Sequence, residues 1–167
     1  MSQSLPDVVM RGTRRKVPKR QPEQPARRTR HETAKALSHV PLFAGFSKRD
    51  LDRLAEETDV VSFGAGQTVV EEGMLGETMF VVLSGEARVA HGKRRLGTVR
   101  PGDFFGEVAV LDGSARSATV VAETPLEAIR LFRRTLLRLL EAEPQLALKI
   151  LDVLVRRVRG VTSALEA

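Results

Sequence analysis

The 167-residue sequence contains no cysteine, no tryptophan and no tyrosine. The absence of cysteine excludes a disulfide framework, thiol redox chemistry and thiolate metal sites. No run approaches the roughly 20 apolar residues that a membrane-spanning helix needs, and the N-terminus lacks the apolar segment of a secretion signal. We therefore expect a cytoplasmic protein without a membrane span, in which seven phenylalanines supply the aromatic packing.

Histidine is scarce as well, with only three residues in the chain. His31 and His39 precede the region of short strands, and His91 stands alone. A metal-dependent enzyme on a small β-barrel would need clustered His and Glu ligands inside the barrel. No Ser/His/Asp or paired-carboxylate arrangement is apparent either. We predict that the protein is not an enzyme and holds neither a metal ion nor a cofactor.

The net charge of +6 is concentrated at the N-terminus. Residues 1–30 hold nine Lys and Arg against two acidic residues, whereas the rest of the chain holds 18 against 19. The same 30 residues contain four of the eight prolines and no aromatic residue, a composition that cannot bury enough surface to fold. We predict a disordered basic tail over residues 1–30 and one domain over residues 31–167. The tail is either a solvated arm or an electrostatic arm for nucleic acid, anionic lipid or an acidic partner.

From residue 60 to residue 131 the chain alternates short apolar stretches with glycine-containing turns. The expected strands span residues 60–63, 67–71, 78–83, 86–91, 95–99, 118–122 and 126–131. Strands this short, with a turn about every 8 to 12 residues, are typical of a sandwich or barrel. We predict an α+β, mainly β fold: an antiparallel β-roll or jelly roll flanked by an N-terminal helix and two C-terminal helices.

The flanking helices have recognisable ends. The expected helix over residues 47–57 begins with Ser47 as its cap and has Asp50 in its first turn. A short basic helix is predicted over residues 133–141. Pro144 should begin a longer helix, because proline is favoured in the first turn.

That last helix carries two apolar lines. One follows heptad spacing and comprises Ala147, Leu151, Leu154, Val158, Val161 and Leu165. The other, through Leu148, Ile150 and Val155, could cover the roll and leave the heptad line for a second copy of the chain. We therefore expect a homodimer through this helix. The alternative is that the heptad line itself covers the roll of its own chain.

The most informative segment runs from Gly102 to Ala122. A helical turn beginning at Gly106 would present free backbone N–H groups, and a glycine lets an anion approach unobstructed. Arg116 can add a two-pronged contact to the same anion. Glu107 would repel a phosphate, so its expected role is to accept a hydrogen bond from a neighbouring hydroxyl such as a ribose 2′-OH. A site that takes both groups predicts a nucleotide ligand.

Two parts of this segment resemble the ends of the phosphate-binding cassette of the cyclic nucleotide-binding domains. They are F-G-E-V-A at residues 105–109 and A-R-S-A-T-V at residues 115–120. Residues 40–46 (V-P-L-F-A-G-F) and residues 72–87 (E-G-M-L-G-E-T-M-F-V-V-L-S-G-E-A) match the same family. The family includes catabolite-activator-type regulators, protein kinase regulatory subunits and nucleotide-gated channels.

The resemblance implies a regulatory sensor domain that binds a 3′,5′-cyclic nucleotide and repositions its C-terminal helices in response. By this similarity the backbone of Gly106 and Ala109 and the side chain of Arg116 meet the phosphate, and Glu107 takes the ribose hydroxyl. Ser117 matches the serine of catabolite-activator-type sites, so cAMP is the expected ligand and cGMP the alternative. The predicted binding residues are Gly106, Glu107, Val108, Ala109, Arg116, Ser117, Thr162 and Ser163.

The resemblance continues into the last helix, where Thr162 would contact the base of its own subunit and Ser163 the base of the partner subunit. The alternative is that these hydroxyls simply face solvent near a fraying helix end. No winged helix-turn-helix follows in the sequence, so we expect a stand-alone domain that does not read operator DNA. The alternative function is a ligand-free interaction module of the same fold that acts through its basic tail on nucleic acid or an acidic partner.

Overall fold

The computed structural model describes residues 24–25 and 28–166, and the side chains of residues 28–160. The strands are β1 (Gln24–Pro25), β2 (Asp59–Phe63), β3 (Thr68–Val70), β4 (Thr78–Ser84), β5 (Ala87–His91), β6 (Arg94–Val99), β7 (Phe104–Phe105), β8 (Thr119–Ala122) and β9 (Leu126–Phe132). The helices are α1 (Arg30–Ser38), α2 (Lys48–Glu57), α3 (Glu107–Asp112), α4 (Arg133–Ala142) and α5 (Pro144–Glu166), with a 3₁₀ turn η1 (Pro41–Phe43).

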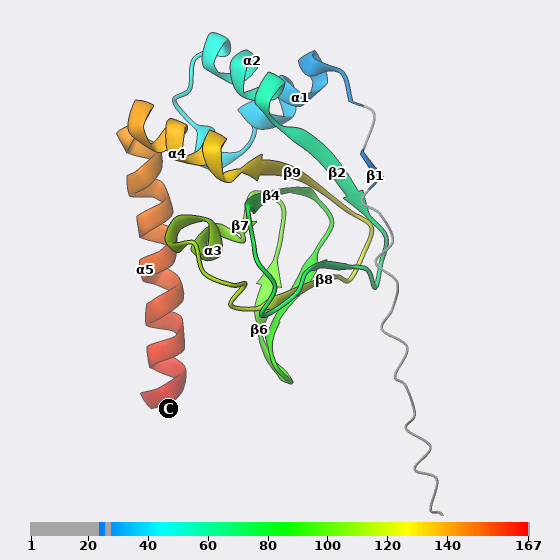
Figure 1. The fold of residues 1–167 in the computed structure, drawn as a ribbon, viewed down its shortest axis with the longest axis vertical. Helices are drawn as coiled ribbons and strands as arrows, with labels where there is room; N and C mark the ends of the chain where they lie inside the picture. The colour runs from blue at the N-terminus through cyan, green and yellow to red at the C-terminus, as the bar shows by residue number, and fades with distance from the viewer. Residues whose placement is uncertain (1–23, 26–27, 167) are drawn as a thin grey trace, which may run out of the picture.

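The strands form two antiparallel sheets. One has the order β1-β2-β9-β4-β7 and the other the order β3-β8-β5-β6. In Figure 1, α1, α2 and α4 lie at one end of the roll, and α5 runs along its side past α3. This arrangement confirms the predicted antiparallel β-roll with flanking helices.

Strand β4 separates two apolar cores, because successive side chains of a strand point to opposite faces. Phe80 and Val82 belong to the core inside the roll. Met79 and Val81 belong to the core between the roll and the helices. All four side chains are at most 1% exposed, which explains why the sequence of this strand is apolar without alternation.

Three phenylalanines meet inside the roll. Phe80 of β4 stacks on Phe105 of β7 with ring centroids 5.2 Å apart, and Phe63 of β2 meets Phe80 edge-on at 6.2 Å. Phe104 points the opposite way, into the core beneath the helices. The two residues of β7 therefore anchor the start of the cassette in both cores at once.

The helix ends follow from local hydrogen bonding. At the start of α2 the Asp50 backbone N–H donates to Ser47 Oγ at 3.1 Å and the Ser47 N–H donates to Asp50 Oδ2 at 3.3 Å, as the sequence predicts. Helix α1 begins at Arg30, one residue before the expected start of the domain, with Thr29 as its cap. Residues 1–23 lie outside the described part of the chain, so the disordered tail stays a prediction.

Helix α5 begins at Pro144, as predicted, and is anchored near that end. Leu146 and Ile150 are 1% and 3% exposed, and Leu154 packs against the same core. The prediction that one apolar line covers the roll and the heptad line faces a partner is therefore partly wrong. Leu154 belongs to the heptad line but packs against the core of its own chain.

The exposed stripe of α5 is correspondingly shifted. Leu148 and Val155, which were expected to cover the roll, are 58% and 44% exposed. The physical reason is that Leu146 and Ile150 fix the rotation of the helix. Leu148 lies two residues after Leu146 and Val155 five residues after Ile150, and at 3.6 residues per turn both offsets point away from the core. The stripe, named here the α5 stripe, consists of Leu148, Leu151, Val155 and Val158.

Candidate functional site

The cassette turns sharply at Gly106, between β7 and α3. The φ angle of Gly106 is +86°, a left-handed conformation that favours glycine. A Cβ at this position would lie 2.7 Å from Arg116 Nη1 and 2.9 Å from the Thr78 carbonyl oxygen. Glycine is therefore required here for two reasons: the backbone is left-handed, and a side chain at residue 106 would collide with the guanidinium of Arg116.

Arg116 points inward from the loop between α3 and β8. Its Nη1 donates to the Thr78 carbonyl at 2.6 Å and to the Gly106 carbonyl at 3.0 Å, and its Nη2 donates to Thr78 Oγ1 at 3.0 Å. The residue is only 8% exposed, and no acidic residue of the described chain forms an ion pair with it. Burial lowers the pKa of the guanidinium, and the charge of Glu107 partly offsets this effect. Arg116 is thus a buried cation whose hydrogen-bond partners are all uncharged.

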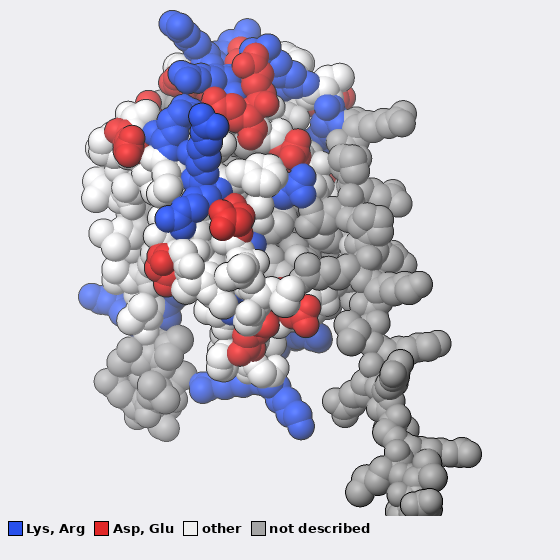
Figure 2. Space-filling model, in the orientation of Figure 1, with Lys and Arg blue, Asp and Glu red and all other residues white. Residues whose placement is uncertain are grey.

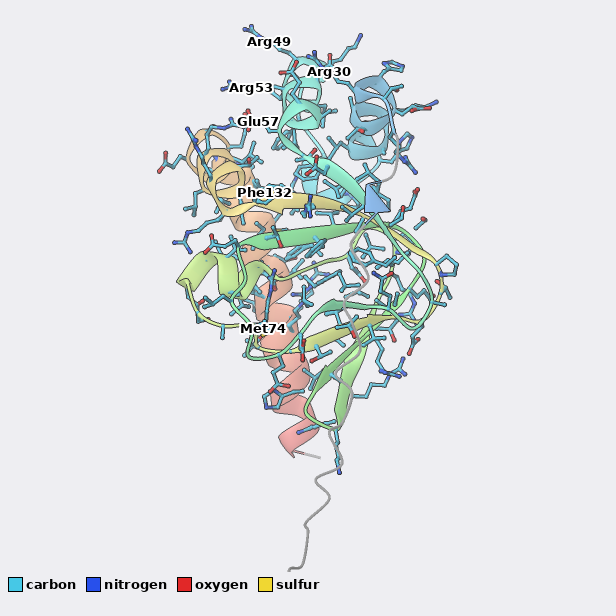
Figure 3. All side chains as sticks on the ribbon, turned by 45° about the vertical axis from the view of Figure 1, so that its right-hand side comes forward. Arg30, Arg49, Arg53, Glu57, Met74 and Phe132 are labelled. Atoms are coloured by element: carbon cyan, nitrogen blue, oxygen red, sulfur yellow. The ribbon has the colours of Figure 1, made fainter. Side chains whose placement is uncertain are left out.

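The loop between β3 and β4 holds this arginine in place. The Arg116 backbone N–H donates to the Met74 carbonyl at 2.8 Å, and the Gly73 N–H donates to the Arg116 carbonyl at 2.9 Å. A bridge between Leu75 and Ala115 continues the pairing. Met74 is labelled at this edge of the roll in Figure 3.

Glu107, the first residue of α3, is 2% exposed. Its Oε1 accepts a hydrogen bond from Nη1 of Arg157 in α5, and the two side chains form an ion pair. Arg157 also donates from Nη2 to the Phe104 carbonyl, and its guanidinium lies 5.0 Å from the Phe104 ring centroid. Burial raises the pKa of Glu107, while Arg157 and the Glu107 backbone N–H act in the opposite direction.

The structure brings most of the predicted binding residues to one place. Gly106 and Glu107 meet Arg116 at the start of α3, where Ala109 is 2% exposed. Val108 faces outward and is 39% exposed. Ser117 is exposed, and its carbonyl oxygen lies 3.0 Å from Nδ1 of His91.

Thr162 and Ser163 belong to α5, but their side chains lie outside the described residues, so their contacts stay predictions. Sequence reasoning missed Gly76, Thr78 and Arg157. The first two lie within the matched segment of residues 72–87, where nothing indicated that they pack on the arginine. Arg157 is one of several arginines in α5 and carries no local signal.

A second polar feature lies away from the cassette, on α1 and α2. It is a hollow of about 550 Å³ lined by Arg30, Lys48, Arg49, Asp52, Arg53 and Glu56. Figure 3 shows Arg30, Arg49 and Arg53 at this end of the molecule. Arg30 pairs with Glu56 and Arg53 with Glu57, and Figure 2 shows basic and acidic side chains intermixed over the same end. Two of the four basic residues that line the hollow, Arg30 and Arg53, are thus paired with acidic side chains.

Two kinds of feature are absent from the described residues. Within residues 24–25 and 28–166, no three His, Cys, Asp or Glu side chains lie close enough together to hold a metal ion. No helix of the described part is both long and apolar enough to span a bilayer.

A β-roll that holds a buried arginine and a buried glutamate around one short helix has the architecture of a small-ligand regulatory domain. The family model of the cyclic nucleotide-binding domain matches residues 60–143. The chain belongs to this family.

Similar proteins come from both fungi and bacteria. The chain is 40% identical over 107 residues to a cAMP-dependent protein kinase regulatory subunit of Aspergillus fumigatus, covering 62% of this chain and 26% of that protein. It is 32% identical over 131 residues to the cyclic AMP receptor protein of Thermus thermophilus, covering 75% of this chain and 61% of that protein. A solved structure described as Sp-2Cl-cAMPS bound to PKAR CBD2 matches with a TM-score of 0.66 and 28% identity, covering 82% of this chain and 89% of that one.

Proposed function

We propose that this domain binds a 3′,5′-cyclic nucleotide, cAMP, at the cassette and acts as a regulatory sensor. The observation that carries the proposal is the environment of Arg116. A buried guanidinium without a carboxylate partner is costly unless an anion compensates its charge. Its three hydrogen bonds use three of the five guanidinium N–H groups, and no described residue accepts a bond from Nε. A phosphate diester can supply both the charge and the missing acceptors.

Glu107 supports the choice of a nucleotide over a simple anion. Its carboxylate can only accept hydrogen bonds when ionised, so the complementary ligand group beside the phosphate is a hydroxyl. A ribose 2′-OH next to a cyclic phosphate fits this requirement. The names of the similar fungal and bacterial proteins refer to cAMP, which supports cAMP over cGMP. We assign the exposed Ser117 to the phosphate, and Thr162 and Ser163 to the base.

We further propose that two copies of the chain pair through the α5 stripe. Its members follow one another at steps of three, four and three residues, which is heptad spacing. Four exposed aliphatic side chains on one helix face favour a partner of the same kind. A second copy offers an identical stripe, and heptad spacing is the pattern that lets two such helices pack.

Isothermal titration calorimetry with cAMP and with cGMP tests the ligand assignment. The intact chain should bind cAMP, and Arg116→Ala should weaken binding by at least about tenfold, as expected for the loss of hydrogen bonds to a charged group. Arg116→Lys keeps the charge without the two-pronged geometry and should also bind more weakly. Arg49→Ala, which removes an exposed arginine of α2, is the matched control and should bind like the intact chain.

Absence of heat with both nucleotides, together with unchanged melting temperatures, would overturn the proposal. The ligand-free interaction module would then be the better description. Such a module would bind a polyanion with an affinity that falls steeply as the salt concentration rises and that does not change when cyclic nucleotide is added.

A further inference from the structure

The hairpin of β5 and β6 contacts the last part of the cassette through one histidine. His91 ends β5, and its Nδ1 lies 3.0 Å from the Ser117 carbonyl oxygen. A carbonyl oxygen only accepts hydrogen bonds, so Nδ1 carries the hydrogen and donates it. The same nitrogen lies 3.0 Å from Oε1 of Glu72, in the loop between β3 and β4. Oε2 of Glu72 accepts from the Gly92 N–H at 2.8 Å, which keeps the carboxylate beside the imidazole.

Ser117 has few other constraints. It is exposed, and the bond from His91 is the only hydrogen bond that it forms with a described residue. Its neighbour Arg116 is fixed separately, by three side-chain hydrogen bonds and by backbone bonds to Gly73 and Met74. On the other side, β8 begins only at Thr119. The roll therefore reaches Ser117 directly only through the imidazole.

We propose that His91 is a positioning residue of the phosphate site, which holds the backbone of Ser117 so that its hydroxyl stays directed at the nucleotide. This inference rests on the proposed function, because Ser117 is assigned there to the phosphate. A residue that is ordered only when the ligand binds loses conformational entropy at that moment, and this loss lowers the affinity. A hydrogen bond that exists before binding removes part of this cost. His91 acts through Ser117 and does not itself touch the nucleotide.

The exposure of the pair separates this role from a general contribution to stability. The His91 side chain is 64% exposed and that of Glu72 is 33% exposed. Interactions between exposed groups contribute little to the free energy of folding, because solvent screens them. Loss of the imidazole should therefore change the ligand affinity and leave the fold as it is.

A double-mutant cycle on the full chain, measured by calorimetry with cAMP, tests the inference. His91→Ala should weaken binding roughly three- to fivefold, as expected for the loss of one hydrogen bond. Ser117→Ala removes the hydroxyl that His91 is proposed to direct, and it should also bind more weakly. Adding His91→Ala to Ser117→Ala should change the affinity by less than about twofold, because two residues that act through one contact are not additive.

Two further variants serve as rescue and control. His91→Asn keeps an N–H donor near the position of Nδ1 and should restore the affinity to within about twofold of that of the intact chain. Lys93→Ala removes an exposed basic side chain from the same hairpin and should bind cAMP like the intact chain. The melting temperature of His91→Ala should stay within about 3 °C of that of the intact chain.

Equal cAMP affinities of His91→Ala and the intact chain overturn the positioning role but leave the cassette function intact. An equal loss with and without the Ser117 hydroxyl also overturns it, because the effect would not pass through Ser117. If the intact chain does not bind cAMP, the proposed function itself fails, and the inference fails with it. A loss that disappears in the Ser117→Ala background and is recovered by His91→Asn supports the inference.

Discussion

The guanidinium of Arg116 lies directly against Gly76. A Cβ on this glycine would lie 2.3 Å from Nε and 2.5 Å from Cζ of the arginine. Gly76 belongs to the loop before β4, whereas Arg116 belongs to the cassette, so the contact joins two segments that are distant in sequence. The guanidinium of Arg116 can lie against the backbone of residue 76 only because this residue has no side chain.

Gly76→Ala should therefore expel the guanidinium without a general loss of structure, because the clash is with the far end of a flexible side chain. We expect cAMP affinity to fall at least about tenfold, as for the loss of the arginine contacts themselves. Calorimetry gives the affinity, and a thermal melt checks the fold. The control is Gly64→Ala, where a Cβ meets nothing within 4 Å. Wild-type affinity in Gly76→Ala would contradict the assigned role of Arg116.

Glu107 should make stability depend on pH. Burial raises its pKa above the ordinary value of 4.5, so the folded state retains a proton that the unfolded state has lost. The free energy of unfolding should therefore fall as pH rises from 4.5 toward the folded pKa. Relative to Glu107→Gln, the intact chain should lose stability across this range.

Urea denaturation at successive pH values measures the difference between the two proteins. Glu141→Gln, a substitution at an exposed position of α4, is the matched control for the loss of a carboxylate. A difference between the intact chain and Glu107→Gln that does not change with pH would contradict the raised pKa of Glu107.

The aromatic cluster inside the roll should dominate its stability. Phe80→Ala removes a ring that stacks on Phe105 and is 1% exposed. We expect the free energy of unfolding to fall by about 3–5 kcal/mol, the range for a buried Phe replaced by Ala. Phe132→Ala, at a residue that is 43% exposed and packs on Arg130, should lose about 1 kcal/mol. Similar losses for the two variants in urea denaturation would contradict the assigned core.

The α5 stripe predicts a dimer that charge can disrupt. The double variant Leu151→Glu, Val158→Glu places like charges opposite one another in the paired helices. The dimer dissociation constant, measured by sedimentation equilibrium, should rise at least about tenfold. Arg159→Glu changes an exposed residue of the same helix outside the stripe and is the matched control. A monomeric intact chain at high concentration would exclude pairing through the stripe.

Much of the fold could be predicted because its signals are local. The expected strand over residues 60–63 is observed as Asp59–Phe63, and the expected helix over residues 133–141 as Arg133–Ala142. Glycine turns, apolar alternation and first-turn prolines act within a few residues, so the sequence displays them directly. The proximity of Gly106 and Arg116 could be predicted for the same reason, since both lie within one short segment of matching sequence.

The orientation of helix α5 could not be predicted, because it depends on how elements far apart in the sequence pack together. Helix α5 offers two apolar lines of similar quality, and a periodicity of 3.6 residues cannot decide which one faces the roll. Packing of Leu146 and Ile150 made that choice and left the α5 stripe exposed.

By itself, the sequence determined the β-roll, the helix ends and a cassette segment with one arginine and one glutamate, which it predicts to bind an anion. Only the tertiary structure decided that Arg116 is buried against Gly76 and that Glu107 is engaged by Arg157. Arg156, Arg157 and Arg159 are alike in sequence, and the crossing of α5 over Phe104 selects Arg157 among them. Such a choice comes from the relative placement of elements far apart in the chain, which local residue patterns do not encode.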